Sequence, residues 1–263
     1  MRLAAYSFAA GPDMEQNLAA IRRGAQQASQ AGARLLALPE CALCGYPPVE
    51  TPGSASIRPE DLEKGFAALA SLAREQALCL FAGSVRYSQG LRYNSTLLFG
   101  PDGSLLGAYD KRALWGWDLD NFARGEQPGV FDVDGLRIGT RICFELRFPE
   151  CFRELYLAKA QLCIVSFCFV APAPNPERLS LLEAHLRTRA TENAMALLSV
   201  NGCSGYQTAP TAFFDANGRA LARAPLHREG LLVQDFLPME ADFGLRGRME
   251  NSDYFISLHA KRL

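Results

Sequence analysis

Residues 141 to 150 read Arg141-Ile142-Cys143-Phe144-Glu145-Leu146-Arg147-Phe148-Pro149-Glu150, and this stretch places a thiol between two different structural patterns. The residues just before it, 136–142, alternate apolar and polar side chains, as a half-buried strand does. Pro149 is typical of the first turn of a helix. We therefore predict that Cys143 lies where a strand ends and a helix begins, a position that suits a nucleophile in an α/β fold.

The surroundings of such a position would activate a thiol. The unpaired N–H groups and the positive dipole end of a nearby helix, together with a cation, would lower the thiol pKa and offer donors to an oxyanion. The alternative is that Cys143 is a small buried hydrophobic residue, as most free cysteines are. The local sequence leaves both interpretations open.

Two more strand-like runs end on charged residues. Residues 34–38 form a short apolar run that leads through Pro39 to Glu40, and a glutamate at a strand end lies at the sheet edge where open α/β sheets place their sites. Residues 105–110 form a run that ends at Lys111, in a chain with four lysines and twenty-three arginines. A compact ammonium, which burial tunes readily, suits a developing oxyanion better than the fixed guanidinium fork.

Together these segments carry a family resemblance that covers almost the whole chain. Three blocks resemble the catalytic blocks of the nitrilase superfamily, the carbon–nitrogen hydrolases, in their usual order: Leu38-Pro39-Glu40, Tyr109-Asp110-Lys111-Arg112 and residues 142–150. Residues 185–193 resemble the family's later Arg-Ala-x-Glu-Asn helix, and Val200-Asn201-Gly202 resembles the strand end after it. The resemblance implies an α/β fold in the form of a four-layer α-β-β-α sandwich, with Glu40 as general base, Lys111 as oxyanion cation and Cys143 as nucleophile.

One position departs from the family pattern. Many members place a second glutamate four residues before the aromatic residue of an aromatic-x-x-Gly segment, and Phe122-Ala123-Arg124-Gly125 puts Asp118 there. Aspartate is one methylene shorter, so it would reach the site only if the backbone between Trp115 and Asp118 comes closer. The alternative is that Asp118 is a solvated loop acid and that Asp120, or no acid, takes this place.

The chemistry that these parts support is thiol amide hydrolysis. A thiolate would attack an amide carbonyl, and the oxyanion would lie against Lys111 and the backbone N–H of Phe144. Glu40 would move the protons in both half reactions. Candidate residues of the substrate pocket are Tyr46, Trp115, Trp117, Arg147, Phe167 and Phe169. The aromatic residues could equally fill the core, and Arg147 could pair with Glu150 or Glu154 instead of a substrate carboxylate.

The residue after the nucleophile narrows the reaction. Phe144 resembles the amidase branches, whereas nitrilases usually resemble Cys-Trp-Glu at this point, so we predict an amidase that cleaves a small linear amide, similar to the ω-amidase-like members. A carbamoyl hydrolase, a nitrilase and a non-catalytic binding or assembly protein of the same fold remain alternatives. A papain-like enzyme with His185 as its base is a further rival.

Whole-chain properties agree with an enzyme. The 263 residues carry a net charge of −1, with no polybasic run, which argues against nucleic acid or membrane surfaces as partners. The charge-free stretch 162–174 is shorter than the roughly 20 residues of a spanning helix. No linker divides the chain, so we expect a single domain over 1–263 whose partner is a small amide. We also expect a homodimer or a higher homo-oligomer.

Eight cysteines in a chain with a full core need not be disulfide staples, and several lie in apolar strand-like runs. We infer a reducing compartment, the cytoplasm. Cys41-x-x-Cys44 has the spacing of a redox or zinc motif, but no second pair of ligands accompanies it. We therefore expect neither a metal nor a cofactor.

Apolar periodicity, caps and turns predict alternating helices and strands. Helices are expected at about 13–32, 59–77, 149–160 and 177–194, and strands at about 1–10, 34–38, 78–86, 93–99, 104–110, 136–142, 162–170, 196–201, 211–214, 219–224 and 230–236.

Overall fold

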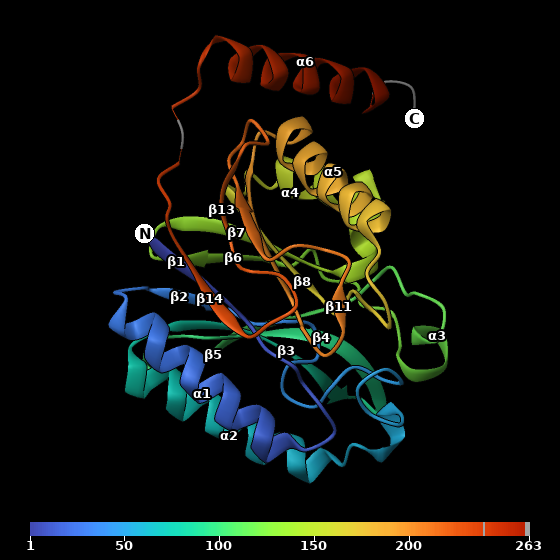
Figure 1. Ribbon diagram of the computed structural model, residues 1–263. Helices are drawn as coiled ribbons and strands as arrows, with labels where there is room; N and C mark the ends of the chain where they lie inside the picture. Colours follow the sequence, from blue (N-terminus) through green and yellow to red (C-terminus); the bar gives the residue numbers. More distant parts are fainter. Residues whose placement is uncertain (239, 261–263) are drawn as a thin grey trace.

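Two six-stranded sheets lie face to face at the centre of the computed structural model, which describes residues 1–238 and 240–260 (Figure 1). The first has the order β14-β1-β2-β3-β4-β5 and the second the order β13-β12-β10-β8-β7-β6. The strands of the first sheet are β1 (Arg2–Ser7), β2 (Leu35–Ala37), β3 (Cys79–Ser88), β4 (Leu91–Phe99), β5 (Leu105–Asp110) and β14 (Gly230–Asp235). Those of the second are β6 (Val130–Val133), β7 (Leu136–Ile142), β8 (Leu162–Phe167), β10 (Ala196–Asn201), β12 (Ala212–Phe214) and β13 (Ala220–Arg223).

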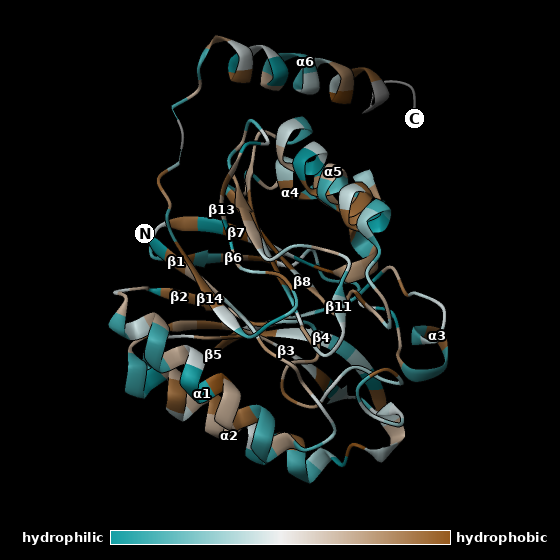
Figure 2. Cartoon of the chain, viewed as in Figure 1, coloured by the Kyte–Doolittle hydropathy of each residue, from teal (hydrophilic) through white to brown (hydrophobic). Residues whose placement is uncertain are grey.

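Helices cover the outer face of each sheet. The first sheet is covered by α1 (Met14–Gln30) and α2 (Pro59–Gln76), and the second by α4 (Pro149–Leu157) and α5 (Pro176–Glu192) (Figure 1). Apolar residues dominate the strands, while α1 and α2 carry both kinds of residue, because only one side of each helix packs on the sheet (Figure 2). The four-layer α-β-β-α sandwich that the sequence predicts is therefore confirmed.

Strand β1 shows how the layers are built. Leu3 and Ala5 point into the core between the two sheets, and Ala4 and Tyr6 point into the core beneath α1 and α2. Successive side chains of a strand face opposite sides, so a strand that is buried on both faces has no need of polar residues. This explains why the central strands read as nearly continuous apolar runs.

The sequence patterns do not predict several short elements and one long helix. The short elements are β6, β9 (Val170–Ala171), β11 (Tyr206–Gln207), the 3₁₀ turns η1 (Ser54–Ser56) and η2 (Cys143–Arg147) and the one-turn helix α3 (Asp118–Asn121). The long helix is α6 (Phe243–Ala260). Helix α6 lies outside the four layers (Figure 1), and Phe243 is 93% exposed, so the packing that produces a clear apolar stripe is weak there.

The carboxyl ends of parallel strands converge at one edge of the sandwich. In the first sheet β1, β2 and β3 run parallel, and in the second β7, β8 and β10 do so. Glu40 follows β2, Cys143 follows β7 and Cys168 follows β8. Lys111 comes directly after β5 and donates its backbone N–H to Asn94 O at 2.8 Å. Segments far apart in sequence thus deliver these groups to one place.

None of the helices in residues 1–238 and 240–260 combines the length and the apolar character that a membrane crossing requires.

Candidate active site

Glu40 is placed by a tight turn that packs against a glycine of β3. The turn brings Cys44 N and Gly45 N to Cys41 O at 3.1 and 2.8 Å. A Cβ on Gly83 would lie 2.1 Å from Pro39 O, so only glycine lets the turn approach β3 this closely. The Glu40 side chain is thereby buried and directed into the interior.

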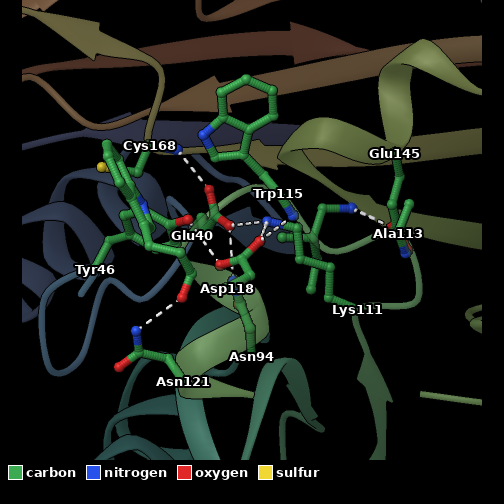
Figure 3. A network of polar contacts seen from close by, with 12 residues as sticks. Glu40, Tyr46, Asn94, Lys111, Ala113, Trp115, Asp118, Asn121, Glu145 and Cys168 are labelled. Carbon is green, nitrogen blue, oxygen red and sulfur yellow. Dashed lines mark hydrogen bonds and ion pairs between the residues drawn. The ribbon is translucent and has the colours of Figure 1, made fainter. Parts of the chain in front are cut away.

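Glu40, Lys111 and Asp118 form a continuous chain of hydrogen bonds (Figure 3). Lys111 Nζ donates to Glu40 Oε1 and to Asp118 Oδ2, both at 2.8 Å. The side chains of all three residues are fully buried. A buried charge is tolerated only where it is paired and hydrogen-bonded, and one ammonium between two carboxylates meets that condition.

The two carboxylates keep Lys111 protonated. Burial lowers the pKa of Lys111, but the charges of Glu40, Cys143 and Asp118 outweigh it and leave the pKa well above its usual value. An ammonium has three donors. In the described part of the chain two of them are used, so the third can donate to a ligand.

Asp118 is buried, and its carboxylate is held on both oxygens. Tyr46 OH donates to Oδ1 at 2.7 Å, and the backbone N–H of Trp115 donates to Oδ2 at 2.8 Å. The backbone from Trp115 to Asp118 curls back on itself at the start of α3, which compensates for the shorter side chain. Asp120, the other candidate, is exposed.

Cys143 lies beside this chain of charges, at the start of η2. Its backbone has a φ of 51°, in the left-handed region, and its side chain is buried. Burial raises the pKa of the Cys143 thiol well above its usual value, the charge of Glu40 raises it further, and Lys111 opposes both.

The expectation of a lowered thiol pKa was therefore wrong. The helix start is displaced from Cys143 by the η2 turn, since α4 begins only at Pro149. Burial and, after it, the negative charge of Glu40 favour the neutral thiol. Cys143 rests protonated at neutral pH, and a base must take its proton when it reacts.

Glu145 ties the cysteine and lysine segments together. Its carboxylate is buried and accepts from the backbone N–H of Arg112 at 2.7 Å and of Ile142 at 2.7 Å. These are the residues directly after Lys111 and directly before Cys143. The relative position of the two functional groups thus depends on one carboxylate that points away from them (Figure 3).

The N–H of Phe144 belongs to the first turn of η2, where backbone donors have no partner within the helix. The ring of Phe144 packs at 4.9 Å from that of Trp115 and at 5.2 Å from that of Phe148. Trp115 is joined to the polar network through its backbone N–H, which donates to Asp118, and its side chain is 44% exposed. Trp117 is exposed to the same extent.

Other predicted pocket residues are more deeply placed. Phe167 and Phe169 stack at 5.2 Å in the core cluster that also contains Cys143. Asn201 fixes this segment, since Phe169 N donates to Asn201 Oδ1 at 2.9 Å. Tyr46 lies with its ring centroid 5.6 Å from Lys111 Nζ.

Arg147 is half-buried at the end of η2. The expected pairing with Glu150 or Glu154 is wrong: among the described residues Glu154 pairs with Arg112 and Arg141, and Arg147 forms no salt bridge. The positive charge of Arg147 instead lowers the pKa of His185, after burial and Arg189. Among the hydrogen bonds of the described residues none joins His185 to Cys143, so no Cys-His pair of the papain type is formed there.

Two hydrogen-bond donors to Glu40 could not be identified from the sequence. Asn94 Nδ2 donates to Glu40 Oε1 at 2.7 Å, and the backbone N–H of Cys168 donates to Oε2 at 2.9 Å. A polar Asn94 just ahead of the apolar run 97–99 of β4 was the only signal for the first. The donor of the second bond is a backbone N–H, which every residue except proline has, so the sequence contained no signal for it.

All eight cysteines are free thiols. Within residues 1–238 and 240–260, no three His, Cys, Asp or Glu side chains gather in an arrangement that could hold a metal ion.

A second carboxyl group lies close by with an unusual titration. Glu50 accepts from Tyr46 N at 2.9 Å and from Ser204 Oγ at 2.5 Å, and burial raises its pKa to about 7. The folded protein therefore holds this proton more tightly than the unfolded chain, whose value is 4.5. The bound proton therefore stabilises the folded protein, and this stabilisation is lost as the pH rises from 4.5 to about 7.

We expect the free energy of unfolding to fall between pH 4.5 and pH 7 with a contribution from Glu50 of up to about 1.4 kcal/mol per pH unit. Glu50→Gln should remove that contribution, and Glu63→Gln, an exposed position on α2, should retain it. Urea unfolding at a series of pH values measures the slopes. Equal slopes in the wild-type protein and Glu50→Gln would contradict the assignment.

The chain is similar in sequence to carbon–nitrogen hydrolases. The sequence model of the carbon–nitrogen hydrolase family matches residues 2–238. The chain is 30% identical over 204 residues to the omega-amidase NIT2 of Xenopus tropicalis, covering 73% of this chain and 71% of the relative. It is 32% identical over 209 residues to a hydrolase encoded in the pqqF 5′ region of Pseudomonas protegens, covering 77% and 70%.

Solved structures agree over the full length. A cysteine-to-alanine mutant of the amidase from Nesterenkonia sp. AN1, in complex with butyramide, superposes with a TM-score of 0.84 at 26% identity, covering 100% of this chain and 97% of that one. A glutamate-to-glutamine mutant of that amidase, which shows acrylamide added at the active-site cysteine, has a TM-score of 0.83 at 27% identity and covers 100% of both chains.

Proposed function

Because this chain belongs to the carbon–nitrogen hydrolase family, we propose that it is an amidase that hydrolyses a small linear amide to a carboxylic acid and ammonia through a thioester on Cys143. The observation that carries the proposal is the buried hydrogen-bonded chain of Glu40, Lys111 and Asp118 beside that thiol. The cysteine adduct and the butyramide complex of the Nesterenkonia amidase support the same chemistry.

The first half reaction begins from a neutral thiol. Glu40 takes the proton from Cys143 as the sulfur attacks the amide carbonyl, because a thiol with a raised pKa is a poor nucleophile until it is deprotonated. The carbonyl oxygen becomes an oxyanion, which the third N–H of Lys111 and the N–H of Phe144 stabilise. Glu40 then gives the proton to the leaving nitrogen, and ammonia departs.

The second half reaction reverses these roles with water. Glu40 removes a proton from a water molecule that attacks the thioester carbonyl, and the same two donors stabilise the second oxyanion. The proton returns to the sulfur of Cys143 as the acid leaves. Asp118 contributes by holding Lys111 in place and charged throughout.

The residues that we propose to border the substrate are Tyr46, Trp115, Trp117, Phe167, Phe169 and Arg147. Mainly aromatic walls favour a short, apolar acyl chain. Arg147, which forms no salt bridge among the described residues, can meet a carboxylate at the far end of a longer one.

A panel of substrates tests the function. Released ammonia should be found with small aliphatic amides, and should disappear in Cys143→Ala. The panel includes the matching nitriles and N-carbamoyl amino acids. Preferred turnover of a nitrile or a carbamoyl compound would replace the amidase assignment with the corresponding hydrolase, and no turnover of any compound by the folded protein would favour a binding role.

We further propose a cytoplasmic homodimer or higher homo-oligomer. Eight free thiols support a reducing compartment. Exposed aromatic residues on α6, among them Phe243 and Tyr254, support association with a second copy. Analytical ultracentrifugation tests the assembly, and a purely monomeric protein at micromolar concentration would exclude it.

Asp118→Asn should lower kcat/KM by about 10²-fold, because a misplaced Lys111 no longer meets the oxyanion. Asp120→Asn, a matched change at an exposed position of the same helix, should be near neutral. Steady-state kinetics of the two variants decide the point. A large loss at position 120 with none at 118 would transfer the role to the other acid.

A further inference from the structure

Cys41 and Cys44 lie within a single turn of chain. Cys44 N donates to Cys41 O at 3.1 Å, so the two residues occupy the first and last positions of a turn. Such a turn holds its end Cα atoms within about 7 Å, and a disulfide requires about 4.4 to 6.8 Å. Both side chains are buried.

The surroundings of the two sulfurs differ. The neighbouring Cys41 thiol lowers the pKa of Cys44, and donors from Val85 N at 3.3 Å and from Ser84 support the same direction against the effect of burial. Burial raises the pKa of Cys41 well above its usual value. Cys44 therefore has the character of the attacking thiolate, and Cys41 that of the thiol that resolves an oxidised sulfur.

Cys44 lines a cavity of about 640 Å³ between the start of α1 and the start of α2. Met14, Leu18 and Ile57 form apolar parts of the wall. In the described part of the chain, Glu40, Lys111 and Cys143 do not line this cavity. A molecule of the size of water or hydrogen peroxide can thus approach Cys44 without entering the substrate site.

The same turn supports the proposed general base. Cys41 follows Glu40 directly and lies with Sγ 3.6 Å from Asn94 Oδ1, and the amide of Asn94 donates to Glu40 Oε1 at 2.7 Å. A disulfide would remove the S–H donor from Asn94 and pull the Cys41 backbone toward Cys44. Both changes act on the position of the Glu40 carboxylate.

We propose that Cys41 and Cys44 are an oxidisable dithiol, which a small peroxide entering from the α1–α2 cavity converts to a disulfide that switches off the site. The Cys44 thiolate attacks one peroxide oxygen, the O–O bond breaks, and hydroxide leaves a sulfenic acid. The Cys41 thiol attacks that sulfur, forms the S–S bond and releases water. The peroxide is reduced to water, and the two thiols are oxidised. The proposed inactivation rests on the proposed amidase function, whereas the formation of the disulfide does not.

Mass spectrometry tests the disulfide without any activity. The experiment uses Cys143→Ala, so that the nucleophile cannot react, and treats the folded protein with hydrogen peroxide. Trypsin cuts after Arg34 and Lys64 but not at the Arg58–Pro59 bond, and the peptide 35–64 contains Cys41 and Cys44 as its only cysteines. We expect this peptide to become about 2 Da lighter, through the loss of two hydrogens, and to gain them back with dithiothreitol.

Two serine variants identify the order of reaction. Cys41→Ser should trap a sulfenic acid at Cys44, detectable with dimedone, and Cys44→Ser should leave the peptide unoxidised at the same peroxide dose. Oxidation at Cys41 in Cys44→Ser, or an unchanged peptide 35–64 in Cys143→Ala, would overturn the dithiol.

The switch is tested in protein with Cys143 intact. Peroxide should reduce amide hydrolysis at least ~10-fold, reversibly with dithiothreitol, and Cys44→Ser should resist the same dose. A disulfide that forms with full activity retained would overturn the coupling to Glu40. If no amide is turned over by the reduced protein, the proposed function fails, while the peptide measurement still decides the dithiol.

Discussion

Replacing Cys143 by alanine is expected to abolish amide hydrolysis, with a loss on the order of 10⁶-fold, as for the removal of a nucleophile from other covalent hydrolases. The reason lies in the geometry of the site. Glu40 and Lys111 are hydrogen-bonded to each other and can polarise a substrate, but without the sulfur no thioester can form.

The position of the acyl group tests the same assignment directly. A turnover quenched in acid should leave the acyl adduct on the tryptic peptide 142–147, which contains Cys143 alone. Cys151→Ala, at a half-buried cysteine on α4, is the matched control and should keep wild-type turnover. An adduct on any other cysteine, or hydrolysis that survives in Cys143→Ala, would refute the nucleophile.

Glu40→Gln is expected to give the second largest loss, ~10²- to 10⁴-fold in kcat/KM. Glutamine keeps the shape of the side chain and can still accept a hydrogen bond from Lys111, but it cannot take a proton from the neutral thiol of Cys143. Both half reactions should therefore slow. Stopped-flow release of ammonia and steady-state acid formation would show the two effects separately.

Glu63→Gln serves as the control for this prediction, because it makes the same chemical change at an exposed position of α2. A Glu40→Gln variant with wild-type turnover and an unaltered melting temperature would remove the general-base role. Lys111→Met is a less selective test. It should also lose activity, but it would leave the Glu40 and Asp118 carboxylates buried without their cation and so destabilise the fold.

The four-layer sandwich and the meeting of Glu40, Lys111 and Cys143 were predicted from the family resemblance of the segments that carry them, and the strand pattern agrees with both. Each of the three residues follows a strand whose apolar run is long enough to recognise, and parallel strands bring their carboxyl ends to a common edge. A strand that is buried on both faces is apolar along its whole length, so its ends can be recognised in the sequence. The observed boundaries of β3 and β7 accordingly differ little from the expected ones.

What escaped prediction depends on distances that no local pattern encodes. The Cys168 N–H reaches Glu40 across the two sheets, although the two residues are 128 positions apart in the chain. The protonated state of Cys143 follows from its burial next to Glu40, and not from the helix that the sequence places nearby. Helix α6 packs so little that its sequence carries no clear stripe.

The buried trio of Glu40, Lys111 and Asp118 also limits how this protein can change over evolutionary time. Loss of one of these residues leaves its neighbour as an unpaired buried charge, which destabilises the folded protein by roughly 3–5 kcal/mol. Natural domains hold only about 5–15 kcal/mol in total. Single substitutions at these positions are thus penalised in stability even in a lineage that no longer needs the reaction. We expect descendants of this fold either to keep all three charges or to replace them together with apolar residues, so intermediates with one or two should be rare.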